Sequence, residues 1–159
     1  MDVSALIDMA KAQNITIATA ESCTGGMIAA ALTDIPGSSA VVDRGYVTYS
    51  NAAKMQMLGV RAETLDTYGA VSEQTAQEMA EGAQQTANVV LAISVTGIAG
   101  PGGSEFKPEG RVCFGLAQKG KTTRTEQVDF GPLGRDQVRL ASRDHALRMI
   151  LRALEATTA

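Results

Sequence analysis

The stretch ITIATAESCTGGMIAAAL (residues 15–32) decides the fold of this chain. Its first part, residues 15–20, alternates in polarity and is rich in β-branched side chains, which predicts a β-strand. Its last part, residues 27–32, consists of strong helix formers. The turn between them, residues 22–26, carries two hydroxyls, a thiol and two glycines. A strand, a tight turn and a helix in this order are typical of an α/β protein.

The rest of the sequence predicts further helices and strands around this unit. Helices are expected at 2–13, 51–58, 62–68, 73–87 and 134–154, and strands at 41–49, 89–95, 111–118 and 122–130. The run at 89–95 is almost continuously apolar, which indicates a strand buried on both faces. The last two strands flank Gly120 and should form an antiparallel hairpin. We therefore expect a single layered α/β/α domain over residues 1–159, with a mixed, mostly parallel sheet and a C-terminal antiparallel hairpin.

Composition excludes several classes of protein. Apolar residues make up 45% of the 159 residues and charged residues 19%, which is a globular composition. The net charge of −3 gives no general attraction to nucleic acid or to an anionic membrane. No apolar run is long enough to cross a bilayer, and the N-terminus does not resemble a signal peptide. These features predict a cytoplasmic protein with reduced thiols, and small Ala-rich α/β enzymes of this kind often form homo-oligomers.

Two glycine-rich turns each follow an expected buried strand. If both strands are parallel, the turns lie at the same edge of the sheet, where open α/β sheets bind their ligands. The candidate binding residues in these turns are Thr24, Gly25, Gly26, Thr96, Gly97 and Gly100. Glycines let backbone N–H groups converge on a phosphate or on a developing oxyanion. The alternative is that the glycines serve only tight turns, but two hydroxyl-rich turns of this kind favour a site.

The common cofactor and metal signatures are missing from the sequence. There is no G-x-x-x-x-G-K-[ST] motif, and the glycines after residue 96 do not fit G-x-G-x-x-G. There is no H-E-x-x-H and no C-x-x-C pair, and the chain has a single histidine. We therefore expect neither a metal nor a cofactor.

Ser22 can be activated in few ways in this chain. The single histidine, His145, lies in the middle of the expected last helix, where we interpret it as a surface or otherwise satisfied side chain. The remaining route is a lysine held neutral by burial, and Lys54 lies one turn beyond the strand at 41–49. An exposed lysine on a helix is the alternative. Cys23 is the rival nucleophile, although a small buried thiol is the simpler interpretation of that residue.

Arginines repeat along the start of the expected last helix. Arg135, Arg139 and Arg143 are spaced four residues apart, so they share one helical face. A solvated basic stripe is the simpler interpretation for Arg143. Arg135 and Arg139, nearest the helix start, are candidates for capturing an anionic group of a ligand.

Six collinear motifs resemble the CinA C-terminal family, which includes stand-alone nicotinamide mononucleotide deamidases. They are AESCTGG (20–26), RGYVTYSNAAK (44–54), GAVSE (69–73), SVTGIAGPGG (94–103), KPEGRV (107–112) and GRDQVR (134–139). The resemblance runs from about residue 5 to residue 152. One departure from the family pattern is Glu109, where a small apolar residue is expected.

The resemblance implies an activity and a set of residues. The reaction is hydrolysis of nicotinamide mononucleotide to nicotinate mononucleotide and ammonia, in pyridine-nucleotide salvage. The serine nucleophile of the family falls on Ser22, its tyrosine and lysine fall on Tyr49 and Lys54, and a site arginine falls on Arg135 or Arg139. No metal is implied. Many members carry a further N-terminal domain that is not expected here, and a non-catalytic nucleotide-binding module related to competence or DNA damage is the alternative function.

Overall fold

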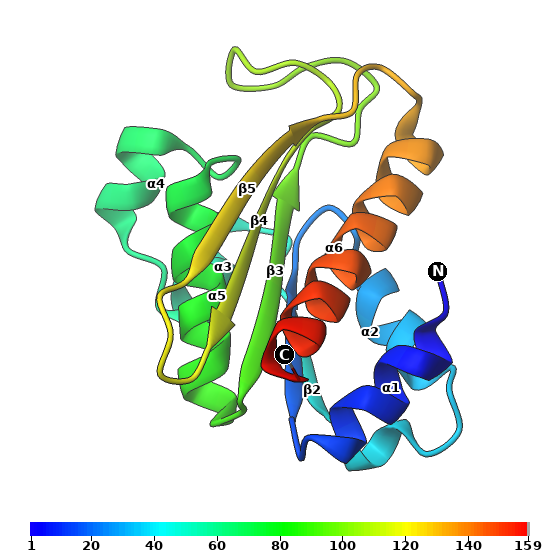
Figure 1. Cartoon of the computed structure of the whole chain (residues 1–159). Coiled ribbons are helices and arrows are strands. Elements are labelled where there is room, and N and C mark those ends of the chain that lie inside the picture. The colour runs from blue at the N-terminus through cyan, green and yellow to red at the C-terminus, as the bar shows by residue number, and fades with distance from the viewer. Residues whose placement is uncertain (159) are drawn as a thin grey trace.

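A five-stranded mixed sheet forms the centre of the computed structural model, which describes residues 1–158 (Figure 1). The strands are β1 (Ile17–Glu21), β2 (Val42–Val47), β3 (Leu91–Gly97), β4 (Arg111–Gln118) and β5 (Arg124–Asp129). Their order is β2-β1-β3-β4-β5. In this described part, β1 is parallel to both β2 and β3, while β4 is antiparallel to β3 and β5. The mixed sheet and the C-terminal hairpin are therefore confirmed, with parallel and antiparallel pairings in equal number.

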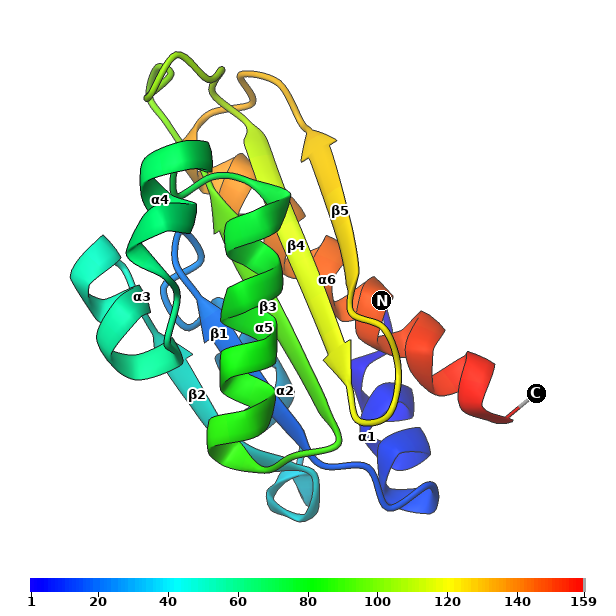
Figure 2. The same cartoon turned by 90° about the vertical axis from the view of Figure 1, so that its left-hand side faces the viewer.

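Helices cover both faces of the sheet. They are α1 (Val3–Ala12), α2 (Met27–Thr33), α3 (Asn51–Leu58), α4 (Ala62–Tyr68), α5 (Glu73–Ala87) and α6 (Arg135–Thr158), with a short 3₁₀ helix, η1 (Ser38–Ala40). Figures 1 and 2 show α1, α2 and α6 on one face and α3, α4 and α5 on the other. The expected order of elements is confirmed, with bounds shifted by a few residues. Residue 159, the end of the domain expected from the sequence, lies outside the described residues.

Capping residues in the sequence explain where the helices on one face begin and end. Ser50 and Ser72 accept hydrogen bonds from backbone N–H groups in the first turns of α3 and α5, at 3.0 and 3.1 Å. Gly59 and Asn88 end the same two helices in the left-handed conformation. Within residues 1–158, no helix combines the length and the hydropathy that a membrane span needs.

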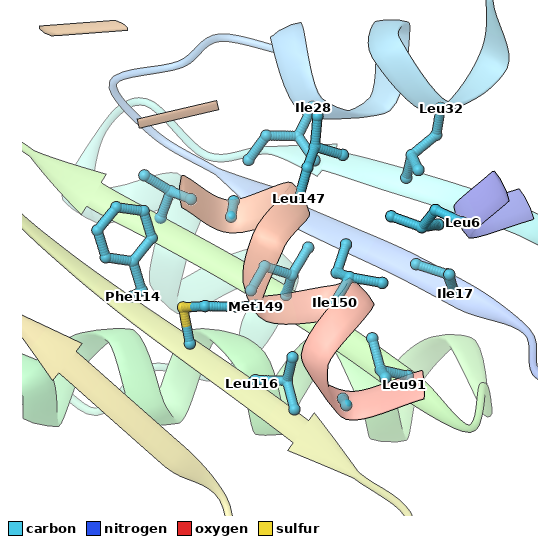
Figure 3. Packing of buried hydrophobic residues seen from close by; sticks show 14 of the residues in the cluster. Leu6, Ile17, Ile28, Leu32, Leu91, Phe114, Leu116, Leu147, Met149 and Ile150 are labelled. Carbon is cyan, nitrogen blue, oxygen red and sulfur yellow. The ribbon is translucent and has the colours of Figure 1, made fainter. Parts of the chain in front are cut away.

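The larger hydrophobic core lies between the sheet and the helices α1, α2 and α6 (Figure 3). Its labelled members are Leu6, Ile17, Ile28, Leu32, Leu91, Phe114, Leu116, Leu147, Met149 and Ile150. A smaller core packs α3 and α5 against the opposite face and contains Ala18, Ala20 and Tyr46. Side chains of β1 therefore alternate between the two cores, as the pleat of a strand requires.

This alternation sets the direction of the residues at the end of β1. Glu21 is four residues after Ile17 on the strand, so its side chain points to the same face of the sheet as that of Ile17. Its carboxylate therefore lies on the α2 side, where it accepts from the N–H groups of Ile28 and Ala29. The N–H of Ser22 still pairs with the carbonyl of Val95 on β3, at 2.9 Å. Ser22 consequently faces the other side of the sheet, toward α3.

Candidate active site

A cleft of about 380 Å³ lies at the carboxyl ends of β1 and β3. This is the sheet edge where the sequence predicts that the two glycine-rich turns meet. The expected site residues in its lining are Ser22, Tyr49, Lys54, Thr96, Gly97, Gly100 and Arg135. The expected residues Thr24, Gly25, Gly26 and Arg139 do not line it.

Among the described residues that line this cleft, Lys54 is the only one with an ionisable amine, guanidinium or carboxylate that is removed from water, with 1% of its surface exposed. Its Nζ lies 3.2 Å from Ser22 Oγ, 3.1 Å from the carbonyl oxygen of Thr48 and 3.4 Å from that of Tyr49. Because carbonyl oxygens only accept, they take two N–H groups of the amine. A neutral amine then has its lone pair left for the hydroxyl of Ser22.

The pKa of Lys54 is lowered from its ordinary value, chiefly because burial penalises the ammonium form. Cys23, in its thiolate form, and the carboxylate of Glu105 oppose this by raising the pKa of Lys54. The net direction favours the neutral amine, which is the form that can accept a proton from Ser22.

Local structure holds Lys54 in this position. Ser50 caps α3, and the N–H of Lys54 donates to the carbonyl of Ser50 in the first turn of that helix, at 3.1 Å. The preceding segment is tied to β1, because the N–H of Thr48 donates to the carbonyl of Glu21 at 2.8 Å. The lysine and the serine are thus joined through paired backbone segments, although they are 32 residues apart in the chain.

The first glycine-rich turn does not offer its N–H groups to a ligand in the way the sequence suggested. The fully buried carboxylate of Glu21 accepts from the N–H of Gly26 at 3.2 Å and from the hydroxyl of Thr24 at 2.6 Å. Gly25 donates its N–H to the carbonyl of Ser22, at 3.0 Å. The N–H groups of Gly25 and Gly26 and the hydroxyl of Thr24 are therefore bonded within the protein, which contradicts their expected use as substrate ligands, because an internal carboxylate occupies the start of α2.

The two candidate arginines have different surroundings. The Nε of Arg139 donates to the carbonyl of Cys23 at 3.0 Å, and its NH2 group lies 3.4 Å from the carbonyl of Thr24. The guanidinium of Arg139 thus bonds the carbonyls of the turn and does not line the cleft, which corrects its expected role as a substrate ligand. The exposed guanidinium of Arg135 donates to the carbonyl of Gly100 at 2.7 Å and to the hydroxyl of Tyr49 at 2.9 Å.

Tyr49 contributes to the site through two different groups. Its carbonyl oxygen accepts from Lys54, while its hydroxyl accepts from Arg135 at the mouth of the cleft. Among the described residues, that hydroxyl has no hydrogen bond to Ser22 or Lys54. This geometry supports an orienting role for Tyr49 and gives no support to a proton relay through its hydroxyl.

The second glycine-rich turn forms the opposite wall of the cleft. The hydroxyl of Thr96 donates to the carbonyl of Ala70 at 2.8 Å, which ties the end of β3 to the segment before α5. A Cβ at Gly97 would lie 2.7 Å from Val112 Cγ2, so this position needs glycine. Glu109, the departure from the family pattern, accepts from the N–H of Gly102 at 2.6 Å and thereby braces this loop.

The CinA C-terminal domain model matches residues 3–154. The chain belongs to this family. The nicotinamide-nucleotide amidohydrolase PncC of Enterobacter agglomerans is 52% identical over 143 residues, which is 89% of this chain and 87% of that protein. A CinA-like protein of Chlorobium phaeobacteroides is 55% identical over 148 residues, 91% of this chain but 35% of that protein. The present CinA C-terminal domain thus spans about a third of the length of such CinA-like relatives.

Solved structures agree with the fold of this CinA C-terminal domain. The competence/damage inducible protein CihA from Agrobacterium tumefaciens is 48% identical, has a TM-score of 0.89, and matches over 98% of this chain and 96% of that one. A CinA superfamily protein from Escherichia coli is 36% identical with a TM-score of 0.91, over 95% and 87% of the two chains.

The sequence did not predict the roles of two carboxylates of this CinA C-terminal domain, Glu21 and Glu105. Glu21 directly precedes Ser22, and the alternation of a strand would have placed it on the opposite face, toward the helix that begins at residue 27. Glu105 lines the cleft and raises the pKa of Lys54. No pattern marks Glu105, because only the folded loop brings it toward a lysine on another element.

Cys23 is poorly suited to be the nucleophile, since burial raises the pKa of its thiol to about 12. Replacement of Cys23 with alanine should therefore leave any ammonia-releasing activity of the cleft within about threefold of wild type, with a modest loss of stability from the small cavity. Ammonia release and thermal unfolding would measure the two effects. Loss of activity in a folded Cys23→Ala protein would show instead that the thiol reacts.

His145 does not line the cleft. The Nε2 of His145 lies 2.9 Å from Glu126 Oε1, and its ring packs on Phe114 with the centroids 4.4 Å apart. The expectation of a satisfied histidine is confirmed. Over residues 1–158 no three His, Cys, Asp or Glu side chains are grouped in a way that could hold a metal ion.

Proposed function

We propose that this CinA C-terminal domain is a serine amidohydrolase that converts nicotinamide mononucleotide and water to nicotinate mononucleotide and ammonia. The observation that carries the proposal is the buried Lys54, whose Nζ lies 3.2 Å from Ser22 Oγ in an open cleft. Relatives named nicotinamide-nucleotide amidohydrolase, 51–52% identical over most of both chains, support the choice of substrate. We place the reaction in cytoplasmic pyridine-nucleotide salvage, by a homo-oligomer.

In the first half of the reaction Ser22 Oγ attacks the carboxamide carbon of the substrate. Neutral Lys54 accepts the hydroxyl proton as the new C–O bond forms, which gives a tetrahedral oxyanion. The ammonium of Lys54 then donates a proton to the amide nitrogen. The C–N bond breaks, ammonia leaves, and an ester of the pyridine nucleotide remains on Ser22.

In the second half a water molecule attacks the ester carbon. Lys54, neutral again, takes a proton from that water, and a second tetrahedral oxyanion forms. Its collapse breaks the bond to Ser22 Oγ, which recovers its proton from Lys54. The product is nicotinate mononucleotide, and both enzyme groups return to their starting states.

Arg135 is our candidate for the 5′-phosphate of the substrate. Its guanidinium lies at the mouth of the cleft and has no carboxylate partner among the described residues. An arginine with unpaired N–H groups suits a phosphate, and the hydroxyl of Tyr49 orients it. The neighbouring N–H groups of the loop beyond Gly97 could add further donors.

Replacement of Arg135 with glutamine should raise KM for nicotinamide mononucleotide by roughly 10- to 100-fold and change kcat little. The same variant should lose the preference of the wild type for the mononucleotide over nicotinamide riboside, which lacks the phosphate. Steady-state ammonia release from both compounds measures this. A variant that keeps its preference for the phosphorylated substrate would rule out Arg135 as the phosphate ligand.

Glu105→Gln should shift the pH profile of this enzyme. Glu105 raises the pKa of Lys54, so removal of its charge lowers that pKa further. The base then becomes neutral at a lower pH, and the acidic limb of the kcat/KM profile moves to lower pH. Glu63, an exposed glutamate on α4, supplies the matched control Glu63→Gln, for which no shift is expected. A shift to higher pH would contradict the assignment of Lys54 as the base.

The second candidate is a nucleotide-binding regulatory module without catalysis. The buried position of Lys54 beside Ser22 favours the enzyme, because a binding module would need only the glycines and arginines of the cleft. The test is ammonia release by the purified protein across a panel of pyridine nucleotides and related amides. The enzyme is supported by turnover of nicotinamide mononucleotide, whereas a rise in melting temperature with this ligand and no ammonia would support the regulatory module.

A further inference from the structure

The nucleophile turn, residues 22–26, is fixed on one side by the carboxylate of Glu21. Gly26 begins α2 without a side-chain cap, and Glu21 takes over that function. Besides Thr24 and Gly26, Glu21 accepts from the N–H groups of Ile28 and Ala29, both at 3.0 Å. Since this carboxylate is fully buried and occupies the start of α2, the positive end of the helix is neutralised from inside the protein.

Arg139 fixes the same turn from α6. Its guanidinium donates to the carbonyls of Cys23 and Thr24, and it is half-buried between the turn and the helix. Two donors of one rigid, planar guanidinium hold two consecutive peptide groups in a defined orientation. Glu21 and Arg139 thus hold opposite ends of the peptide dipoles in one short turn.

Two N–H groups of the nucleophile turn have no hydrogen-bond partner on another residue. Within the turn, Gly25 donates to the carbonyl of Ser22 and Met27 to that of Thr24, both at 3.0 Å. In the part of the chain that the structure describes, the N–H of Thr24 has no hydrogen-bond partner, and the N–H of Cys23 interacts only with the thiol of its own residue. These two groups directly follow the nucleophile, which is where an acyl-transfer enzyme needs donors for the oxyanion.

Each of these N–H groups shares a peptide group with a carbonyl that is hydrogen-bonded. In the peptide group between Ser22 and Cys23, the carbonyl of Ser22 accepts a hydrogen bond from the N–H of Gly25. In the peptide group between Cys23 and Thr24, the carbonyl of Cys23 accepts a hydrogen bond from Arg139. In a planar trans peptide the two groups point in opposite directions, and a hydrogen bond at the carbonyl polarises the N–H.

We infer that Glu21 and Arg139 are positioning residues that hold the backbone N–H groups of Cys23 and Thr24 as the oxyanion hole of Ser22. Arg139 acts through the Cys23–Thr24 peptide group and strengthens the donor that faces away from it. This inference rests on the proposed serine chemistry, but it does not depend on which amide is the substrate.

The test uses a fluorophosphonate probe, which reacts with an activated serine and places a phosphoryl oxygen where the oxyanion would lie. The rate of Ser22 modification is followed by intact mass in wild type, Arg139→Met, Arg139→Lys and Glu21→Gln. We expect Arg139→Met to slow labelling by roughly 10- to 100-fold, near the loss of one oxyanion donor. Arg139→Lys keeps the charge but not the planar fork, so an intermediate rate is expected, and Glu21→Gln should also be slower than wild type.

Arg148→Met is the matched control, because Arg148 is an exposed arginine of the same helix. It should label at the wild-type rate. In ammonia assays, Arg139→Lys should lower kcat while KM stays within about threefold, since Arg139 does not line the cleft. A loss of binding alone, with kcat unchanged, would return Arg139 to the role of substrate ligand.

The inference is overturned if a folded Arg139→Met or Arg139→Lys protein labels at the wild-type rate. It is also overturned if Arg148→Met slows labelling equally, or if wild-type Ser22 does not react with the probe. Where Arg139→Met does not fold, Arg139→Lys alone decides. Failure of the proposed function looks different, because Ser22 would then react with the probe while no ammonia comes from nicotinamide mononucleotide.

Discussion

Replacing Lys54 with methionine is expected to lower kcat/KM for nicotinamide mononucleotide by about 10²- to 10⁴-fold, the range of a lost general base. Methionine fills much of the same buried volume but cannot accept the proton of Ser22. The two carbonyls that hold the amine, of Thr48 and Tyr49, would each lose a donor. Ammonia release under saturating and limiting substrate measures the loss. The matched control is Lys121→Met, since Lys121 is exposed near the β4–β5 turn and should have no effect.

The pH dependence of unfolding, compared between wild type and Lys54→Met, tests the lowered pKa of Lys54 independently of catalysis. Burial lowers the pKa of Lys54 in the folded protein, so between that value and the ordinary value near 10.4 the unfolded chain binds more protons. Wild-type stability relative to Lys54→Met should therefore rise as the pH rises toward about 10 and fall as the pH is lowered. Urea unfolding of both proteins at several pH values checks the sign. A stability difference that moves the other way would mean that Lys54 is charged in the fold.

Replacing Ser22 with alanine is expected to lower kcat by more than about 10⁴-fold, as the loss of a nucleophile does in other serine hydrolases. The fold should persist, because the N–H of Ser22 keeps its bond to Val95 and the carbonyls of Thr48 and Tyr49 still hold Lys54. Substrate binding should persist as well, since the phosphate contact proposed for Arg135 lies elsewhere in the cleft. Calorimetry on the inactive protein would measure the affinity directly.

The control for Ser22→Ala is Ser4→Ala, at an exposed position on α1. It should have wild-type activity. If Ser22→Ala retained activity while Cys23→Ala lost it, the thiol would be the nucleophile. If both variants remained active, the chemistry would have to come from a water molecule, and the covalent route would be wrong.

Much of the fold follows from the periodicity of the sequence. The strand at β1, the buried strand at β3 and the hairpin of β4 and β5 all have local signals, and the structure confirms each of them. The share of parallel pairing could not be obtained in this way, because it depends on which strands become neighbours. Strand order is decided by the packing of whole helices on the two faces.

The candidate site was partly predictable because the chain has few reactive side chains. With one histidine and few lysines, Ser22 and Lys54 were the remaining pair, and their atoms do meet at 3.2 Å. The glycine-rich turn misled the prediction, because the N–H of Gly26 bonds Glu21 and the N–H of Gly25 bonds the carbonyl of Ser22. Arg139 misled it for a different reason: its partners lie 115 and 116 residues away, and helical spacing alone cannot tell a ligand arginine from one that braces backbone.

The most direct test of the Ser22–Lys54 pair is the pH dependence of Ser22 labelling by a fluorophosphonate, in wild type and in Lys54→Met. In wild type the rate should rise with pH and then reach a plateau, because neutral Lys54 is the base. The midpoint of the rise gives an apparent pKa, which should lie below the ordinary lysine value near 10.4. In Lys54→Met that transition should be absent and the rate far lower. The same pH dependence and the same rates in both proteins would contradict activation of Ser22 by Lys54.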